Sequence, residues 1–139
     1  MSDKVSAALR ELARSRSEFR CEYCLIGEEE VFLPHEPDHI IAVKHGGLTV
    51  SENLAWACFL CNRFKGSDLA SVDPVSDEIV RLFDPRSQRW SNHFQIDQGR
   101  IEGRTPEGRA TARMLRFNLP DAVNTRRRLI ASGRFAVAR

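Results

Sequence analysis

The sequence of 139 residues contains no long hydrophobic run. No apolar stretch approaches the roughly 20 residues of a membrane-spanning helix, so we expect no membrane association. The first residues, MSDKVSAALRELARSR, interleave charged and apolar side chains and lack the apolar segment of a secretory signal peptide. Internal repeats and low-complexity tracts are also missing. We therefore expect a cytoplasmic globular protein, in keeping with 42% hydrophobic and 29% charged residues.

Lysine is absent from residues 100–139, although this end of the chain is basic. It carries 10 arginines against 3 acidic residues, a balance of +7, whereas residues 1–99 carry 11 Lys or Arg against 16 acidic residues, a balance of −5. Guanidinium groups match phosphate geometry and stay charged, so an arginine-only basic end favours a polyanionic partner, above all nucleic acid. The alternative is an ordinary solvated helix face.

Cysteine is scarce, and its spacing is informative. The four cysteines form two C-x2-C pairs, Cys21 with Cys24 and Cys58 with Cys61, separated by 33 residues. In a reducing compartment such pairs indicate zinc ligands more than disulfides, and a closed four-thiolate site holds a structural ion. A redox C-x-x-C pair and four free core cysteines are the alternatives. Because the gap exceeds the roughly 15 to 20 residues of a simple zinc ribbon, it houses something else.

Hydrophobic periodicity predicts a mixed set of short helices and strands. Helices are expected at residues 3–15, from about residue 58 onward, from 105 to about 118, and from 120 to about 132. Strands are expected at VFL (31–33), NLAWAC (53–58), DEIVRLFDP (77–85) and FQIDQGRIEG (94–103). Thr105 with Pro106 is a helix start signal, because the hydroxyl caps the first turn and proline fits its first position.

The residues inside and just beyond the cysteine pairs resemble the HNH endonuclease family, whose core is the ββα-metal fold. The likeness is carried over residues 21–66 by CEYC, DHIIAVKHGG, SENLAWACFLCN and CNRFKG. The segments LFDPRSQRWSNHF and TPEGRATARMLRFN are similar to the tail of a bacterial subgroup of the family. The resemblance implies an α+β fold, with a ββα-metal nuclease core closed by a four-cysteine zinc site and extended by a C-terminal β-hairpin and two helices.

The same resemblance implies a domain organisation. The chain would be a single HNH nuclease domain over residues 1–139. An N-terminal helix would occupy residues 1–20, the zinc-stapled core residues 21–68, and the hairpin and helical extension residues 69–139.

Four residues match the family's catalytic positions. Asp38 matches the metal-binding acid, and His39 matches the general base, because a neutral imidazole can take a proton from water. Asn53 matches the middle asparagine, which holds the loop and so orients the histidine. Asn62 stands where the family has a last metal-binding histidine, as in the HNH domain of CRISPR effectors. An amide oxygen is harder than an imidazole nitrogen, so the implied catalytic ion is Mg2+ or Mn2+.

Basic residues are the candidates for binding nucleic acid. Lys65 lies three residues after Asn62 and could reach a phosphate, as could Arg63. Further along, arginines recur at helical spacing at positions 109, 113 and 116, so either Arg109, Arg113 and Arg116 follow a DNA backbone or they form a solvated face. His35 and His45 are expected to be solvated loop histidines, and the alternative is that they assist the site.

These signals lead to one functional hypothesis and two rivals. The hypothesis is a metal-dependent HNH endonuclease that hydrolyses a phosphodiester in DNA, with zinc as structural ion and Mg2+ or Mn2+ as catalytic ion. The first rival is a catalytically inactive, zinc-stapled DNA-binding module. The second is a zinc-ribbon protein-interaction module, which would lack salt-dependent DNA binding.

Overall fold

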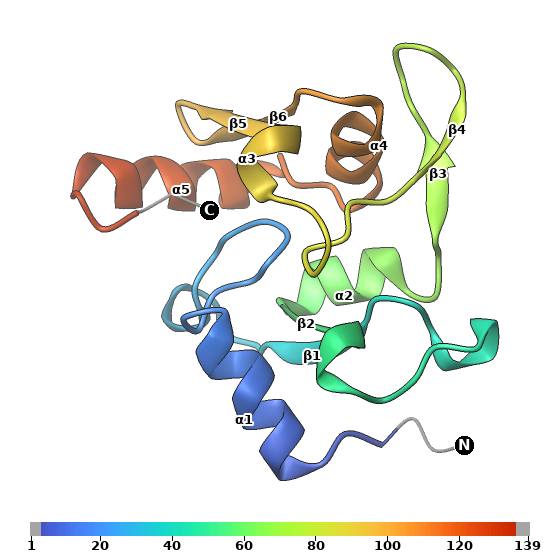
Figure 1. The fold of residues 1–139 in the computed structure, drawn as a ribbon. Coiled ribbons are helices and arrows are strands. Elements are labelled where there is room, and N and C mark those ends of the chain that lie inside the picture. The colour runs from blue at the N-terminus through green and yellow to red at the C-terminus, as the bar shows by residue number, and fades with distance from the viewer. Residues whose placement is uncertain (1–3, 136–139) are drawn as a thin grey trace. The chain divides into compact units, whose positions relative to one another are not determined.

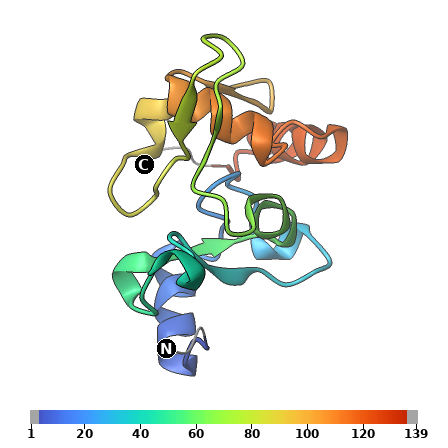
Figure 2. The same cartoon turned by 90° about the vertical axis from the view of Figure 1, so that its right-hand side faces the viewer.

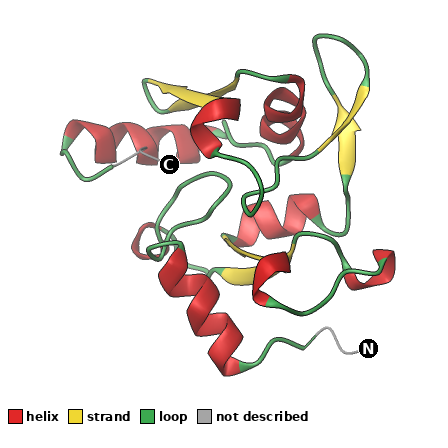
Figure 3. Cartoon of the chain, viewed as in Figure 1, coloured by secondary structure: helices red, strands yellow, loops and turns green. Residues whose placement is uncertain are grey.

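A computed structural model describes residues 4–135 and divides them into two compact units. Unit 1 comprises the residues up to Leu69 together with Asp84–Ser87, and unit 2 comprises Ala70–Phe83 together with the residues from Gln88 onward. Within these described residues there are five α-helices and three two-stranded antiparallel sheets (Figure 3). The mixed α and β fold predicted from the sequence is thereby confirmed.

Unit 1 contains a strand–strand–helix core (Figure 1). In chain order the elements of the unit are helix α1 (Ala7–Arg16), the 3-10 helix η1 (Glu28–Glu30), strand β1 (Glu36–His39), the 3-10 helices η2 (Val43–His45) and η3 (Ser51–Asn53), strand β2 (Leu54–Ala57) and helix α2 (Phe59–Lys65). Strands β1 and β2 pair with Asp38 opposite Ala55 and His39 opposite Leu54. Since α2 packs against β1, the three elements form the expected ββα arrangement.

The sequence explains why β2 and α2 form where they do. All four residues of β2, LAWA, are buried, as expected for a strand covered on both faces. The chain then turns at Cys58, which has extended backbone geometry and accepts a hydrogen bond at Sγ from the backbone of Cys61. Cys58 is therefore both the N-cap of α2 and a member of the second cysteine pair.

Helix α1 packs against the β1–β2 hairpin (Figure 2), and its arginines make the polar contacts with the hairpin. Arg10 donates to Glu36 at 2.8 Å, and Arg16 donates to the carbonyl of Leu54 at 2.9 Å. Ala13 is the residue of α1 that is buried, while Leu12 is 47% exposed. The apolar periodicity of the sequence thus predicted the position of α1. The apolar face of the helix is small, and its arginine side chains bond to the hairpin.

The strand expected at residues 31–33 does not form, and this prediction was wrong. Val31, Phe32 and Leu33 lie in an exposed loop, and Phe32 is fully exposed. The strand lies instead at Glu36–His39 and includes Pro37, paired opposite Trp56. Proline is tolerated there because β1 is an edge strand of a two-stranded sheet.

Unit 2 is built from two hairpins and three helices (Figure 1). In chain order these elements are strands β3 (Ala70–Val72) and β4 (Ile79–Arg81), helix α3 (Trp90–His93), strands β5 (Phe94–Asp97) and β6 (Arg100–Gly103), and helices α4 (Pro106–Met114) and α5 (Pro120–Ala131). Thr105 caps α4 by accepting from the backbone of Gly108 at 3.0 Å. Helix α4 packs against both hairpins and ends four residues earlier than expected, because Arg116 has a left-handed φ of 51°.

The core of unit 2 is aromatic. Phe94 contacts three other rings, with centroid distances of 4.9 Å to Trp90, 5.2 Å to Phe83 and 5.6 Å to Phe117. Each of these four side chains is at most 3% exposed. The rings hold α3, β5 and the segment after α4 together, so the aromatic residues around position 90 serve packing.

A buried ion pair fixes the β3–β4 hairpin to α4. The guanidinium of Arg109 donates two hydrogen bonds to the carboxylate of Asp73, each at 2.9 Å, and Ser76 adds a hydroxyl donor at 2.8 Å. The Asp73 side chain has no exposed surface. Arg109, followed by the bonds from Ser76, lowers the pKa of Asp73 well below its ordinary value. Arg109 is therefore a structural residue of unit 2.

We expect Asp73→Asn to destabilise unit 2 at neutral pH and much less in acid. The pKa of Asp73 is lower in the folded chain than in the unfolded one, so its ionised form favours folding. That stabilisation is fully present above the ordinary value of about 4 and is lost as the pH falls through the folded pKa. Melting temperatures of parent and variant, measured from pH 7 downward, should converge in acid.

The matched control is Asp77→Asn. Asp77 lies in the same hairpin and is exposed, and its φ of 64° is one that asparagine tolerates. This variant should melt close to the parent at every pH. Equal effects of the two substitutions would contradict the role of Asp73.

Candidate active site and metal centre

The four cysteines come together in one buried cluster in unit 1. The sulfur atoms of Cys21, Cys24, Cys58 and Cys61 all lie within 4.8 Å of one another. Four thiolates about 2.3 Å from a tetrahedral zinc ion would be about 3.8 Å apart. The Sγ atoms of Cys24 and Cys58 are 3.6 Å apart, which fits this spacing and is too long for a disulfide. The cluster therefore has the donors and the spacing of a zinc site.

Backbone N–H groups point at the sulfurs, as anionic thiolates require. The backbone amides of Tyr23 and Cys24 donate to Cys21 Sγ, and that of Cys61 donates to Cys58 Sγ, each at 3.4 Å. Hydrogen bonds from the other cysteines, Cys21 first among them, lower the pKa of Cys58, whereas a hydrogen bond from Cys21 raises the pKa of Cys24 and burial raises that of Cys61. A metal ion needs thiolates, and the lowered pKa of Cys58 favours one of them.

The first cysteine pair is also anchored by Glu22. Its buried carboxylate accepts from the backbone N–H of Trp56 at 3.3 Å, and its other oxygen accepts from Arg86. Arg86 belongs to the short segment Asp84–Ser87 that is part of unit 1. The knuckle is thereby bonded to β2 on one side and to this later segment on the other.

Asp38 lies in the middle of β1 and is only 4% exposed. Its Oδ2 accepts from the Tyr23 hydroxyl at 2.8 Å and from Lys65 Nζ at 3.1 Å, whereas Oδ1 has Lys65 Nζ at 3.4 Å. Burial raises the pKa of Asp38, and the Lys65 ammonium and the Tyr23 hydroxyl oppose that rise. Burial also raises the pKa of Tyr23, which keeps its hydroxyl protonated as a donor.

Lys65 is held inside the protein. Its side chain is 2% exposed, and its ammonium also donates to the carbonyls of His39 and Ile40, both at 3.1 Å. A phosphate contact by Lys65, as expected from the sequence, would require these bonds to be given up. In the arrangement seen here Lys65 neutralises Asp38 and ties the end of β1 to α2. Arg63, by contrast, is exposed.

His39 is half-buried at the end of β1. Its Nε2 lies 3.0 Å from the hydroxyl oxygen of Thr49, which follows the double glycine of the loop. Only one ring nitrogen is used by this bond. If Nε2 carries the proton and donates it to Thr49, Nδ1 keeps a lone pair that can accept a proton.

Asn53 holds the loop between β1 and β2. Its amide donates to the carbonyls of Ile41 at 2.9 Å and Leu48 at 2.8 Å, and its carbonyl oxygen accepts from the backbone N–H of Ile41 at 2.9 Å. Gly47 allows the close approach, because a Cβ there would lie 1.7 Å from the Ile41 carbonyl oxygen. These bonds fix the segment that carries Thr49 next to His39.

Asn62 is half-exposed on α2, one turn before Lys65. Within residues 4–135 no hydrogen bond is recorded for its side-chain amide, so its oxygen can still act as a ligand. A carboxylate oxygen of Asp38 and an amide oxygen of Asn62 are hard donors that suit Mg2+ or Mn2+. The donor chemistry of these two residues therefore suits such an ion. The ion would share the Asp38 carboxylate with the Lys65 ammonium.

The other two histidines of the loop region differ from each other. His35 is 1% exposed and bonds at 2.9 Å to the carbonyl of Ile26, so the expectation that it is solvated was wrong. It lies against Trp56, with ring centroids 6.4 Å apart. His45 is exposed and bonds to the carbonyl of Ser67 at 3.1 Å. Neither one bonds to Asp38 or His39 among the described residues.

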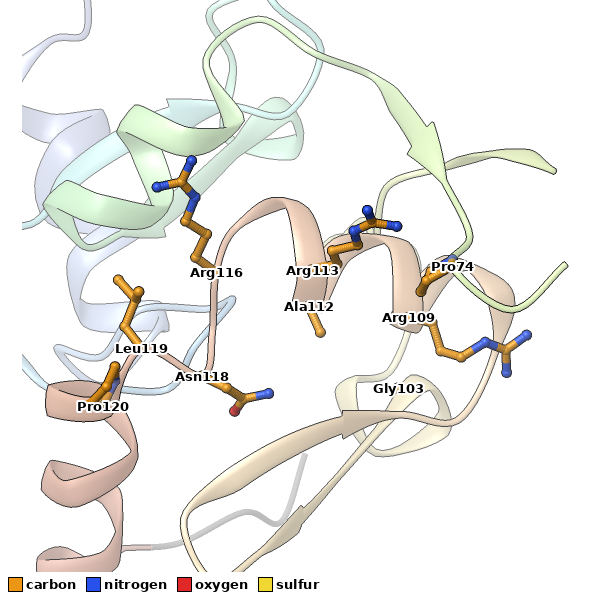
Figure 4. A pocket seen from close by; sticks show the side chains of 9 residues that line it. All are labelled: Pro74, Gly103, Arg109, Ala112, Arg113, Arg116, Asn118, Leu119 and Pro120. Carbon is orange, nitrogen blue, oxygen red and sulfur yellow. The ribbon is translucent and has the colours of Figure 1, made fainter. Parts of the chain in front are cut away.

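In unit 2, an open pocket of about 420 Å³ lies along α4 and the segment that follows it. Arg109, Arg113 and Arg116 line it together with Leu119 and Pro120 (Figure 4). Arg109 is paired with Asp73, whereas Arg113 and Arg116 are exposed. In Figure 4 the latter two extend to one side of the helix and Arg109 extends away from them. The three arginines are neighbours, but they differ in how far they are available to a ligand.

Strands β1 and β2 and helix α2, closed by the cysteine cluster, define the class of a small ββα metal-site domain. The model of the HNH endonuclease family matches residues 21–68, which are this same segment. Residues 21–68 are thus an HNH endonuclease domain, and such a nuclease domain implies a nucleic acid substrate. No curated protein and no solved structure matches the chain. Among the described helices, none combines the length and the apolar character needed to cross a membrane.

Sequence reasoning missed two residues that contact the candidate catalytic pair. Tyr23 bonds to Asp38 and Thr49 bonds to His39. The position of Tyr23 between two cysteines was a signal of burial, but nothing in the sequence showed which group its hydroxyl meets. Thr49 gave no signal at all.

We expect Cys58→Ser to lower the zinc content and to unfold unit 1. A structural zinc contributes roughly 10 to 16 kcal/mol of apparent binding energy, about as much as the whole stability of a typical domain. Elemental analysis and circular dichroism measure the two effects. Cys58→His is the matched rescue, since three thiolates and one imidazole also bind zinc. A folded, zinc-free Cys58→Ser protein would contradict the structural role of the cluster.

Proposed function

We propose that the protein is a metal-dependent HNH endonuclease that hydrolyses phosphodiester bonds in DNA. The observation that carries the proposal is the convergence of Asp38, His39 and Asn53 on one hairpin, with Asn62 on the helix that packs against it, inside the segment matched by the family model. A cytoplasmic location and a structural zinc are part of the same proposal.

In this proposal His39 is the general base. We assign the tautomer in which His39 Nε2–H donates a hydrogen bond to the Thr49 hydroxyl, whose oxygen lies 3.0 Å away, so that Nδ1 takes the proton from the attacking water. Asn53 acts one step further away, because it holds the loop that carries Thr49. The imidazole then has one orientation and one tautomer suited to its task.

Asp38 and Asn62 would hold one divalent cation, Mg2+ or Mn2+. When bound, such an ion supplies positive charge to the scissile phosphate and to the leaving oxygen. The role of Lys65 is to hold Asp38, and through the His39 carbonyl it also fixes the backbone that carries the base. Any movement of this end of β1 would therefore displace Asp38 and His39 together.

Exposed basic residues would hold the DNA backbone. Arg63 lies on the same helix as Asn62, and Arg113 and Arg116 line the pocket of unit 2. Each such contact adds affinity that depends on salt and not on sequence. Arg109 was expected among these residues, but its guanidinium is already paired with Asp73, so we assign the backbone contacts of this surface to Arg113 and Arg116.

One observation favours a second candidate, an inactive zinc-stapled DNA-binding module. Asp38 is buried and already neutralised by Lys65, as a purely structural carboxylate would be. Two features favour the nuclease, namely Oδ1 of Asp38, which has only a long contact to Lys65, and the side-chain amide of Asn62, which makes no hydrogen bond within residues 4–135.

Incubation with supercoiled plasmid separates the two candidates, because only the nuclease nicks DNA. Mild EDTA should stop nicking without unfolding the protein, and Mg2+ or Mn2+ should restore it.

We expect His39→Ala to slow plasmid nicking by about 10²-fold or more, since a positioned general base contributes roughly 10² to 10⁴. Zinc content and fold should stay unchanged. The control is His45→Ala, which removes an exposed histidine from the same loop and should nick like the parent. If His39→Ala cuts within a few-fold of the parent, His39 is not the base.

We expect replacement of Arg113 and Arg116 by glutamine to flatten the salt dependence of DNA binding. Each neutralised phosphate adds roughly 0.9 to the slope of log affinity against log salt, so the double variant should lose up to about 1.8. Binding is measured in Ca2+, in which we expect no cleavage. Replacing Arg127 and Arg128, exposed arginines outside the pocket, removes the same charge and should leave most of the slope intact. Equal losses would make the effect one of net charge alone.

A further inference from the structure

Tyr23 occupies a singular position, because it belongs to the cysteine knuckle and contacts the candidate catalytic acid. It lies between Cys21 and Cys24, and its backbone N–H donates to Cys21 Sγ at 3.4 Å. Its hydroxyl donates to Asp38 Oδ2 at 2.8 Å. Both side chains are buried, at 1% and 4% exposure. One residue thus joins the structural metal centre to the carboxylate.

The bonds to Asp38 are unequal between its two oxygens. Oδ2 accepts from Tyr23 at 2.8 Å and from Lys65 at 3.1 Å, whereas Oδ1 has only the longer contact to Lys65, at 3.4 Å, among the contacts recorded for it. An ionised carboxylate offers about four lone-pair positions. Oδ2 is therefore committed to the protein interior, and Oδ1 keeps the capacity to bind a cation.

We propose that Tyr23 is a positioning residue that clamps Oδ2 of Asp38, so that the cysteine knuckle sets the orientation in which Oδ1 meets the catalytic cation. The inference rests on the proposed function, because it requires a cation at Asp38. Its physical basis is that hydrogen bonds to a ligating carboxylate fix its orientation, and the loss of such a partner weakens metal affinity roughly 10 to 100-fold.

The rest of the knuckle supports a rigid clamp. Glu22, the neighbour of Tyr23, is bonded to the backbone of Trp56 and to Arg86. The Tyr23 ring is enclosed, and the cluster sulfurs hold the backbone on both sides of it. A hydroxyl carried on a fixed ring and a fixed backbone can hold a carboxylate in one rotamer, which a solvent molecule cannot do.

The test is Tyr23→Phe in the full-length, zinc-loaded protein, with Mn2+ binding followed by electron paramagnetic resonance. The substitution removes one oxygen and keeps the ring. We expect about one zinc per chain, a fold like that of the parent, and Mn2+ affinity weakened roughly 10-fold or more. The Mg2+ concentration for half-maximal nicking should rise in parallel, while DNA affinity in Ca2+ at saturation is unchanged.

The matched control is Glu29→Gln, which removes an exposed carboxylate outside the knuckle. It leaves the bonds of Asp38 and of Glu22 in place, and we expect Mn2+ affinity like that of the parent. Parent-like Mn2+ binding by a folded Tyr23→Phe protein overturns the inference while leaving the proposed function in place. If the parent itself binds no Mn2+, the proposed cation site and the inference fail together.

A second measurement decides the matter if Tyr23→Phe does not fold. The chain contains a single tyrosine, so 3-fluorotyrosine gives one ¹⁹F resonance in the otherwise unaltered protein. Because the labelled hydroxyl bonds to Asp38, Mg2+ at Oδ1 should shift this resonance with the same dependence on concentration as nicking. A resonance that does not respond to Mg2+ while nicking does would overturn the role of Tyr23.

Discussion

The cluster of four cysteine sulfurs is the constraint on which the rest of unit 1 depends. It joins the knuckle at Cys21 and Cys24 to the N-terminus of α2, and together with the bonds from Lys65 to β1 it makes a two-stranded sheet and a seven-residue helix into one body. A hairpin of four-residue strands is marginal in water, and a helix of two turns is not stable alone. The site is therefore held by metal-ligand chemistry where a larger domain would use a hydrophobic core.

Buried polar bonds then fix the side chains within the unit that the cysteine cluster holds together. Lys65 and Tyr23 meet at Asp38, and both bonds lie in an interior where an unpaired carboxylate would be costly. The same Lys65 bonds to the His39 carbonyl, so Asp38 and His39 share one support. Buried ion pairs add little net stability, but they specify geometry, and geometry is what the proposed catalytic roles of these two residues require.

Unit 2 follows a different physical principle. Its hairpins and helices gather around rings such as Phe94, and the ion pair of Asp73 with Arg109 joins the β3–β4 hairpin to α4. The arginines of α4 consequently differ, because Arg109 is paired inside the unit and Arg113 is exposed. Arg109 and Arg113 lie one turn apart and differ in this way, a distinction that charge counting along a helix does not make.

Motifs and spacing indicated the metal-ligand set, the strand near residues 53–58 with the helix that follows it, and the family whose model matches residues 21–68. These are local or periodic features, and the sequence records them directly. Tertiary structure decided that Lys65 is buried, that Thr49 meets His39 and that Tyr23 meets Asp38. Each of these contacts joins side chains that are ten or more residues apart in the sequence. Polar side chains of the same type are buried and paired at one position and exposed at another, so residue type alone does not predict them. The strand misplaced onto residues 31–33 has the same cause, because pairing with β2 outweighed local propensity.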